Sequence, residues 1–490
     1  MTSSPSRTSA PARSGKRDLT SGPIAGTLLA FALPTLGSNV LQSLNGSINA
    51  IWVGRFLGED ALAATSNANI IMFLLFGAVF GFGMAATILV GQSFGRRDAD
   101  GARRAFGSAI GLVLVASIVV GALGWIFAPE ILRMLATPPA AFDLALAYLR
   151  VIFVGLPGQM LLVLMFMGLR GTGDSLTPLW FMGLSVVLDA ALNPVLILGL
   201  GPAPRMGIAG SAAATLLSGV VAVIALAAYI HHRDLPLRLK GAERRYILPE
   251  AKLTRVIVAK GLPIGAQMLV ISVAGLAMVG LVNRLGVQTT AGYGVTLQLW
   301  AYVQMPALAI GAAVSAMAAQ NIGAGRWDRV GRITRAGLLF NLGLTGAAVA
   351  IMLLLDRPLL GIFVGGESPA VPIAQHINRL ATWGFVMFGA TMVLFGVVRA
   401  NGAVWGPLVI LFVSMFPIRL GLAVGLQPWL GQDALWWSFP IGSAANLIGA
   451  ALYYRYGPWR GSGAALPSRG ECEQRANSVA EPTGTLRPAT

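Results

Sequence analysis

Residues 176–200 read LTPLWFMGLSVVLDAALNPVLILGL, an apolar run with one acid, Asp189, close to its centre. The run exceeds the roughly 20 residues that a helix needs to cross a bilayer. An ionised carboxylate in the middle of a membrane helix costs about 2.5 to 3.5 kcal/mol on insertion scales, so such residues usually face a bundle interior or a wet cavity and serve a function. Asp189 is therefore the first candidate site residue.

Two neighbours in the same run extend this candidate site. Asn193 follows Asp189 by four residues, which places both side chains on one face of a helix. Pro194 cannot donate a hydrogen bond to the Ala190 carbonyl, and its ring crowds that oxygen. We therefore expect the helix to be kinked beside the acid.

The composition assigns the whole chain to the membrane. Hydrophobic residues make up 56% of the 490 positions and charged residues 11%, with a mean hydropathy of +0.72. No ordinary soluble domain has this balance. Backbone polar groups in hydrocarbon need internal partners, and the runs are too long for barrel strands, so we expect an all-α polytopic protein with about twelve transmembrane helices. The expected spans are 24–54, 61–94, 102–128, 141–169, 176–200, 207–231, 254–284, 289–322, 330–355, 370–398, 404–426 and 433–455.

The basic residues are gathered on one side of these spans. The formal charge of +16 could suggest nucleic-acid binding, but the arginine clusters fall in alternate connections and in the two tails. This is the positive-inside pattern, which predicts that both termini lie in the cytoplasm. We expect the membrane to be the plasma (inner) membrane of a bacterium. Anionic lipids are then sufficient partners for the charge, and no nucleic acid is required. The clusters span residues 7–17, 96–104, 233–255, 326–335 and 455–487.

The chain contains an internal repeat. Pro34 and Pro263, Arg170 and Arg399, and Pro178 and Pro407 are each 229 positions apart. An even number of spans per half returns the chain to its starting side, so the halves should be parallel six-helix bundles related by a pseudo-two-fold axis along the membrane normal. We expect a substrate path between two lobes that rock in alternating access. The expected division is a disordered tail at 1–22, an N-lobe at 23–231, a linker at 232–253, a C-lobe at 254–455 and a second disordered tail at 456–490.

Other polar residues inside the spans are candidates for a substrate cavity. Ser38, Gln42, Asn45 and Asn49 recur at intervals of four, three and four, which draws a polar stripe along the first span. Arg419 lies one residue from the repeat position of Asp189 and could face the acid across the cleft. The single cysteine, Cys472, and three histidines are too few for a metal cluster, so neither a metal nor a cofactor is expected. The remaining cavity candidates are Asn67, Asn69 and Gln267.

Together these motifs resemble the multidrug and toxic compound extrusion family of secondary transporters over residues 24–455. The resemblance rests on Leu33-Pro34, Ile51-Trp-Val-Gly54, Gln92-Ser-Phe-Gly95, the segment Gly168 to Pro178, and the segment Gly207 to Thr215. It implies two six-helix bundles in a V around a central cavity. It also implies efflux of cationic or amphipathic compounds, driven by protons or sodium.

Two departures from the family pattern decide which residues inherit its roles. Family members often carry an acid where this chain has Asn49, and they often show Asn before Asp-Pro where this chain has Asp189 before Asn193-Pro194. We therefore assign proton binding to Asp189 alone and place Asn193, Asn49, Asn45 and Thr215 in a supporting polar network. Pro34 and Pro194 are the expected kinks. Some sodium-coupled members use acids in the seventh and tenth spans, and this chain has none there.

The sequence thus predicts proton-coupled antiport by a monomer, with Asp189 alternating between charged and neutral forms. Burial disfavours the charged form of a carboxyl group, whereas hydrogen bonds from Asn49 and Asn193 favour it. Sodium coupling remains an alternative, as does a flippase for lipid-linked saccharides, although only Arg419 is available there for a pyrophosphate. An enzyme would need a second catalytic group at membrane depth, and none is found, so we expect no enzymatic activity. A scaffold without transport explains the duplication and the lone acid less well.

Overall fold

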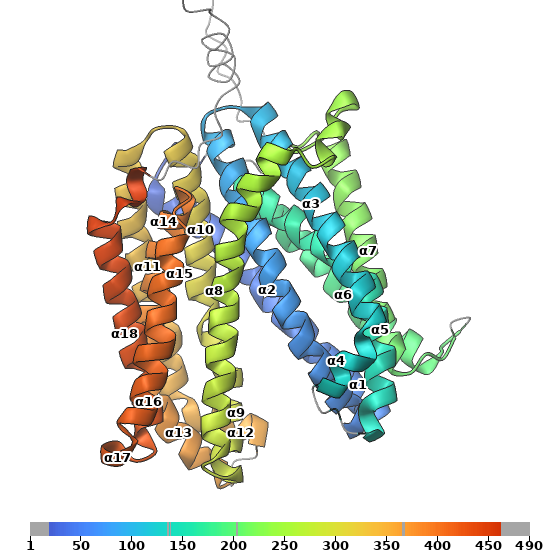
Figure 1. Cartoon of the computed structure of the whole chain (residues 1–490), viewed down its shortest axis with the longest axis vertical. Coiled ribbons are helices and arrows are strands. Elements are labelled where there is room, and N and C mark those ends of the chain that lie inside the picture. The colour runs from blue at the N-terminus through green and yellow to red at the C-terminus, as the bar shows by residue number, and fades with distance from the viewer. Residues whose placement is uncertain (1–18, 135–136, 138, 202–203, 365–367, 462–490) are drawn as a thin grey trace, which may run out of the picture.

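The computed structural model describes residues 19–134, 137, 139–201, 204–364 and 368–461, without side-chain detail for most of 59–78. The described chain folds into helices that form two bundles lying side by side (Figure 1). The helices are α1 Ile24–Leu57, α2 Glu59–Gly95, α3 Ala99–Ile126, α4 Ala128–Met134, α5 Pro139–Gly171, α6 Leu176–Leu198, α7 Ile208–His232, η1 Gly241–Ile247, α8 Ala251–Asn283, α9 Val287–Val303, α10 Met305–Gly323, α11 Trp327–Leu354, α12 Asp356–Val364, α13 Ala370–Ala381, α14 Gly384–Ala400, α15 Trp405–Val413, η2 Ser414–Leu420, α16 Gly421–Gly425, α17 Gln427–Leu430, α18 Asp433–Tyr456 and η3 Pro458–Gly461.

Each of the twelve expected spans coincides with one of these helices or with a short series of them. Nine stretches of the described chain are long and apolar enough to cross a membrane, and the bent pair α13–α14 makes a tenth. The helices α2 and α18, with 37 and 24 residues, have the length for the other two. The protein is therefore an all-α polytopic membrane protein with six spans in each bundle, α1–α7 in the N-lobe and α8–α18 in the C-lobe (Figure 1).

Three spans of the C-lobe are interrupted, which the apolar pattern did not predict. The span 289–322 is divided at Gln304, where Pro306 at the start of α10 cannot continue the hydrogen bonding of α9. The span 370–398 bends by 46° between Ala381 and Gly384. The span 404–426 winds into a π-helix, η2, which contains Pro417 and Arg419.

Both ends of the described chain, at Leu19 and at Trp459, are held against the C-lobe. Leu19 is fully buried in a core cluster that also contains Leu28 and Phe31 of α1 and Ile310 of α10. At the other end, Trp459 is buried in the same cluster because its ring stacks on Tyr454. The expected tails at 1–22 and 456–490 otherwise lie outside the described residues.

Two glutamines at equivalent repeat positions join the lobes at one end of the molecule. Gln92 Nε2 donates to the Ala400 carbonyl at 2.7 Å, and Gln320 Nε2 donates to the Gly171 carbonyl at 2.9 Å. Both glutamine side chains are buried, so loss of either bond would leave a polar group without a partner. We call this end, which carries Arg96, the linker and the start of α11, the basic end. In Figure 1 the bundles are close there, at the top, and their lower ends are apart.

Glycines let the two backbones approach at this junction. A Cβ atom on Gly95 would collide with the Gln320 carbonyl, and one on Gly323 would collide with the Gln92 carbonyl. Deeper in the molecule, Gly81 of α2 meets the backbone of α8 at Gly261. Small residues allow helices to pack this closely in a membrane. The basic end is therefore a tight, pseudo-symmetric junction between the lobes.

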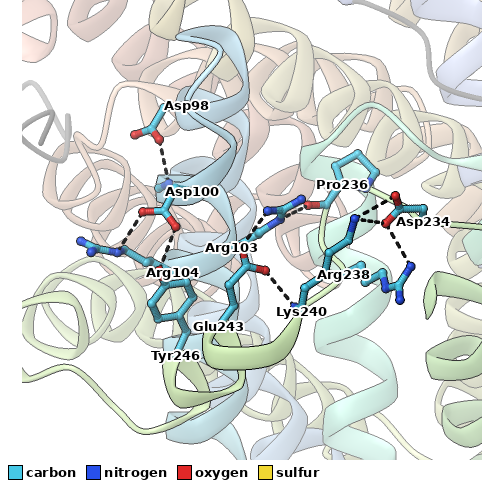
Figure 2. A network of polar contacts seen from close by, with 11 residues as sticks. Asp98, Asp100, Arg103, Arg104, Asp234, Pro236, Arg238, Lys240, Glu243 and Tyr246 are labelled. Atoms are coloured by element: carbon cyan, nitrogen blue, oxygen red, sulfur yellow. Dashed lines mark hydrogen bonds and ion pairs between the residues drawn. The ribbon is translucent and has the colours of Figure 1, made fainter.

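The linker between the bundles is fixed to the N-lobe rather than loose (Figure 2). Arg103 of α3 donates to the Pro236 carbonyl at 3.1 Å and pairs with Glu243 at 2.8 Å. The Tyr246 hydroxyl donates to Asp100 at 2.9 Å. Within the linker, a hydrogen bond from Lys240 holds the pKa of Asp234 below its usual range, so this acid stays ionised under physiological conditions. Further along, Ile247 and Pro249 also pack against Gly111 of α3, so the linker follows the N-lobe as far as Pro249.

We predict that Gly95→Ala separates the lobes at the basic end. The added methyl group meets the Gln320 backbone. Overpacking costs about 1 to 3 kcal/mol, or roughly a 5- to 150-fold change in the equilibrium between joined and separated lobes. Spin labels on Ala242 and Arg335, in a Cys472→Ser background, should report a longer distance.

The matched control is Gly331→Ala, at a helical glycine of the C-lobe with open space where the methyl group would lie. It should leave the distance distribution unchanged. An unchanged distribution for Gly95→Ala itself would show that the glycine contact does not hold the lobes together.

Candidate functional site

The acid singled out by the sequence is enclosed by the N-lobe. Asp189 lies in the middle of α6 and is fully buried, with 0% of its surface exposed. The predicted neighbour Asn193 lies one turn further on and donates to Asp189 Oδ1 at 3.1 Å and to the Asp189 carbonyl at 2.9 Å. The helix continues through Pro194 to Leu198. Pro194 has no N–H to donate to the Ala190 carbonyl, and the Asn193 side chain donates to the carbonyl just before it, that of Asp189.

Two further helices bring donors to the same carboxylate. Asn49 of α1 donates from Nδ2 to Asp189 Oδ2 at 3.0 Å. The Thr215 hydroxyl of α7 lies 3.2 Å from Oδ1 and 3.4 Å from Oδ2. Asn193 Nδ2 also reaches Asn49 Oδ1 at 2.7 Å, which closes a ring of side chains across α1, α6 and α7. The structure thus brings the predicted residues Asp189, Asn193, Asn49 and Thr215 together.

Asn45 completes this group and leaves an acceptor unused. It lies one turn before Asn49 on α1, and its side chain also interacts with the Asp189 carboxylate. Among the described residues, Asn45 Oδ1 and Asn193 Oδ1 are buried without a hydrogen-bond partner. Buried polar atoms without partners are rare in folded proteins and call for a physical explanation.

The neighbours of Asp189 are neutral hydrogen-bond donors. No ion pair to Asp189 is found in the part of the chain that the structure describes. The carboxylate is therefore removed from water without a compensating cation, and its charge is stabilised only by amide and hydroxyl groups. Such a group can bind a proton or a cation more readily than one locked to a guanidinium.

Arg419 does not face this acid. Its guanidinium lies 3.6 Å from the ring centre of Phe439, and one nitrogen donates to Met415 Sδ at 3.5 Å. Tyr293 is a further neighbour in the C-lobe. The proposed pairing with Asp189 across the cleft is therefore absent here, because Arg419 turns into the aromatic interior of its own lobe.

The other cavity candidates have separate positions. Ser38 is buried and donates to the Pro34 carbonyl within its own helix, whereas Gln42 is exposed. Pro34 itself lies inside α1, which continues to Leu57. Gln267 is buried and donates to the Val404 carbonyl at 3.4 Å, so its amide joins α8 to the start of α15. The side chains of the remaining two candidates, Asn67 and Asn69, lie outside the described residues.

Sequence reasoning missed two residues of α5 beside the site. Tyr148 is buried and close enough to Asp189 for an electrostatic interaction, and Gln159 Nε2 donates to the Thr215 carbonyl at 3.4 Å. They are 11 positions apart, which is about three helical turns and therefore one face. This spacing of two polar groups in the span 141–169 is a signal that could have identified them.

We predict that Asn49→Ala destabilises the protein by about 1 to 3 kcal/mol, because it leaves a buried carboxylate without one donor and Asn193 without one acceptor. The measurement is thermal unfolding in detergent. Asn39→Ala on the same helix, away from the network, is the control, and equal losses for the two variants would contradict the prediction.

Comparison with known proteins finds similar proteins over most of the chain. The family model MatE matches residues 34–195 and 263–424, two ranges that begin and end 229 positions apart, as the internal repeat predicts. A probable multidrug resistance protein of Bacillus subtilis, YoeA, is 33% identical over 87% of this chain and 92% of its own. An FAD transporter of Shewanella oneidensis is 27% identical over 90% of this chain and 96% of its own. A structure titled as the outward-facing conformation of a multidrug resistance MATE family transporter superposes with a TM-score of 0.81, at 20% identity over 90% and 97% of the two chains.

Proposed function

The chain belongs to the multidrug and toxic compound extrusion family of transporters, and on that premise we propose that it exports cationic or amphipathic small molecules by proton-coupled antiport. Asp189 is the group that binds the proton. The observation that carries this proposal is a fully buried carboxylate whose partners are neutral donors from three helices.

The surrounding amides support exchange between two protonation states. The ionised carboxylate accepts hydrogen bonds from Asn49, Asn193 and Thr215. A protonated carboxyl group is itself a donor and needs an acceptor. The unpartnered oxygen of Asn45 supplies this acceptor when the Asn45 amide, which already contacts Asp189, rotates.

The helix α1 links protonation of Asp189 to the arrangement of the two lobes. Its first turns, at Leu28 and Phe31, pack in a core cluster with helices of the C-lobe. Its second half presents Asn49 to Asp189 in the N-lobe. A change in how the carboxyl group holds Asn49 therefore acts on a helix that both lobes share.

The proposed direction of transport follows from the charge pattern. We assign the basic end to the cytoplasm by the positive-inside rule. The lobes are then joined on the cytoplasmic side, and an external proton reaches Asp189 from the opposite side. Coupling requires that the proton and the substrate favour different lobe arrangements, since a ligand with equal affinity for both shifts neither.

We predict that Asp189→Asn reduces efflux driven by a pH gradient, because an amide cannot exchange a proton and the coupling to the gradient is lost. The loss should be about 5- to 150-fold, the range of typical coupling free energies. The assay uses the full-length protein in vesicles, with organic cations as substrates under separate proton and sodium gradients. FAD belongs in the panel because of the relative named for its transport.

The control is Asp143→Asn, the same chemical change at an exposed position in the N-lobe. It should transport like the wild type. Undiminished proton-driven efflux by Asp189→Asn would exclude the assigned role of Asp189. Efflux by the wild type that follows the sodium gradient alone would identify sodium, rather than the proton, as the coupling ion.

A further inference from the structure

A cavity of about 730 Å³ lies at the basic end, on the junction between the lobes. Gly95, Arg96 and Arg97 line it from the N-lobe, and Gly323 and Arg326 line it from the C-lobe. The two glycines are those whose backbones meet the opposite lobe. The cavity therefore has these walls only while the lobes are joined at this end.

Arg97 adopts a backbone conformation that its residue type disfavours. Its φ angle is +60°, in the left-handed region. The Arg97 N–H bonds to the Phe94 carbonyl at 3.0 Å, and the Asp98 N–H bonds to the Ser93 carbonyl at 2.9 Å. This is the hydrogen-bond pattern of a Schellman motif, with Arg97 at the position where helices usually carry glycine.

The equivalent helix end in the second repeat has the same geometry without this strain. The helix α10 ends with the same pair of hydrogen bonds, from Gly325 to Ile322 and from Arg326 to Asn321, and here the left-handed residue is Gly325 with a φ of +72°. An arginine in place of this glycine adds steric strain at Arg97, and strain of this kind marks functional positions. The difference between the repeats therefore points to a role for the Arg97 side chain.

Five charged residues line the cavity. Three are basic, Arg96, Arg97 and Arg326, and two are acidic, Asp98 and Asp100.

Both acids have other partners. Asp98 caps α3 through the Gly101 N–H at 2.8 Å. Asp100 pairs with Arg104 at 3.2 Å and accepts the Tyr246 hydroxyl (Figure 2). Arg326 donates to the Thr20 carbonyl at 2.6 Å, a neutral acceptor that leaves the guanidinium charge in place. With Asp100 paired to Arg104, the guanidinium groups of Arg97 and Arg326 outnumber the remaining carboxylate of the cavity wall, Asp98.

We propose that this cavity binds a phosphate-type oxyanion and that the bound anion holds the lobes together at the basic end. Guanidinium groups match the geometry of phosphate oxygens with two parallel hydrogen bonds. Because residues of both lobes form the walls, the anion binds the joined arrangement in preference to the separated one and shifts the equilibrium toward it. A soluble phosphate compound and an anionic lipid headgroup share this chemistry.

The test uses the purified full-length protein in detergent, with inorganic pyrophosphate as the probe. Pyrophosphate at constant ionic strength should raise the temperature of thermal unfolding. Arg97→Gly should weaken this response about 10- to 150-fold in concentration, the effect of losing a charge-assisted hydrogen bond. The variant carries the residue that the second repeat has at this position, so it removes strain and keeps the helix end. The control is Arg133→Ala, an exposed arginine outside the cavity that pairs with Glu130.

Two further arms identify the source of the anion and its effect on the lobes. Nanodiscs of phosphatidylcholine with and without phosphatidylglycerol test the lipid headgroup, and spin labels on Ala242 and Arg335 test closure. A response to either probe that depends on Arg97, with a shorter distance between the labels, supports the proposal and names the source. Equal responses of the wild type and Arg97→Gly to both probes overturn it, as does a response that potassium chloride reproduces at the same ionic strength.

Discussion

The interaction on which the proposed transport depends is a carboxylate held by amide and hydroxyl groups inside a membrane protein. Asp189 is fully buried and has no cation beside it among the described residues, so its charge relies on Asn49, Asn193 and Thr215. Neutral donors stabilise a buried anion less than a guanidinium does. This weaker support leaves the acid able to change its charge, whereas a salt bridge would fix it.

The helices that carry these residues also link the site to the contact between the lobes. The helices α1, α6 and α7 meet at Asp189, and α1 also begins in the core cluster of the C-lobe. At the basic end the two lobes touch through paired glutamines and glycines at repeat-related positions. The duplicated halves therefore share a symmetric junction but differ at their centres, where one carries an acid and the other carries Arg419 packed on Phe439.

The sequence predicted the features that depend on local pattern. Apolar length located the twelve spans, the 229-residue repeat predicted the two lobes, and helical spacing placed Asn193 beside Asp189. The interruption at Gln304 beside Pro306 and the helical spacing of Tyr148 and Gln159 are local signals that apolar length alone does not use. The π-helix around Arg419 depends instead on packing between distant segments, which no local pattern specifies. Arg419 illustrates the limit: its repeat position suggested a partner for Asp189, but the aromatic residues of its own lobe hold it.

The most direct test of the central claim is proton release on substrate binding. The purified protein in weakly buffered detergent solution, with a pH indicator dye, is mixed with an organic cation such as tetraphenylphosphonium. If Asp189 exchanges its proton against the substrate, the wild type releases protons and Asp189→Asn releases none. Equal release by both proteins, or binding without any release, would contradict the account.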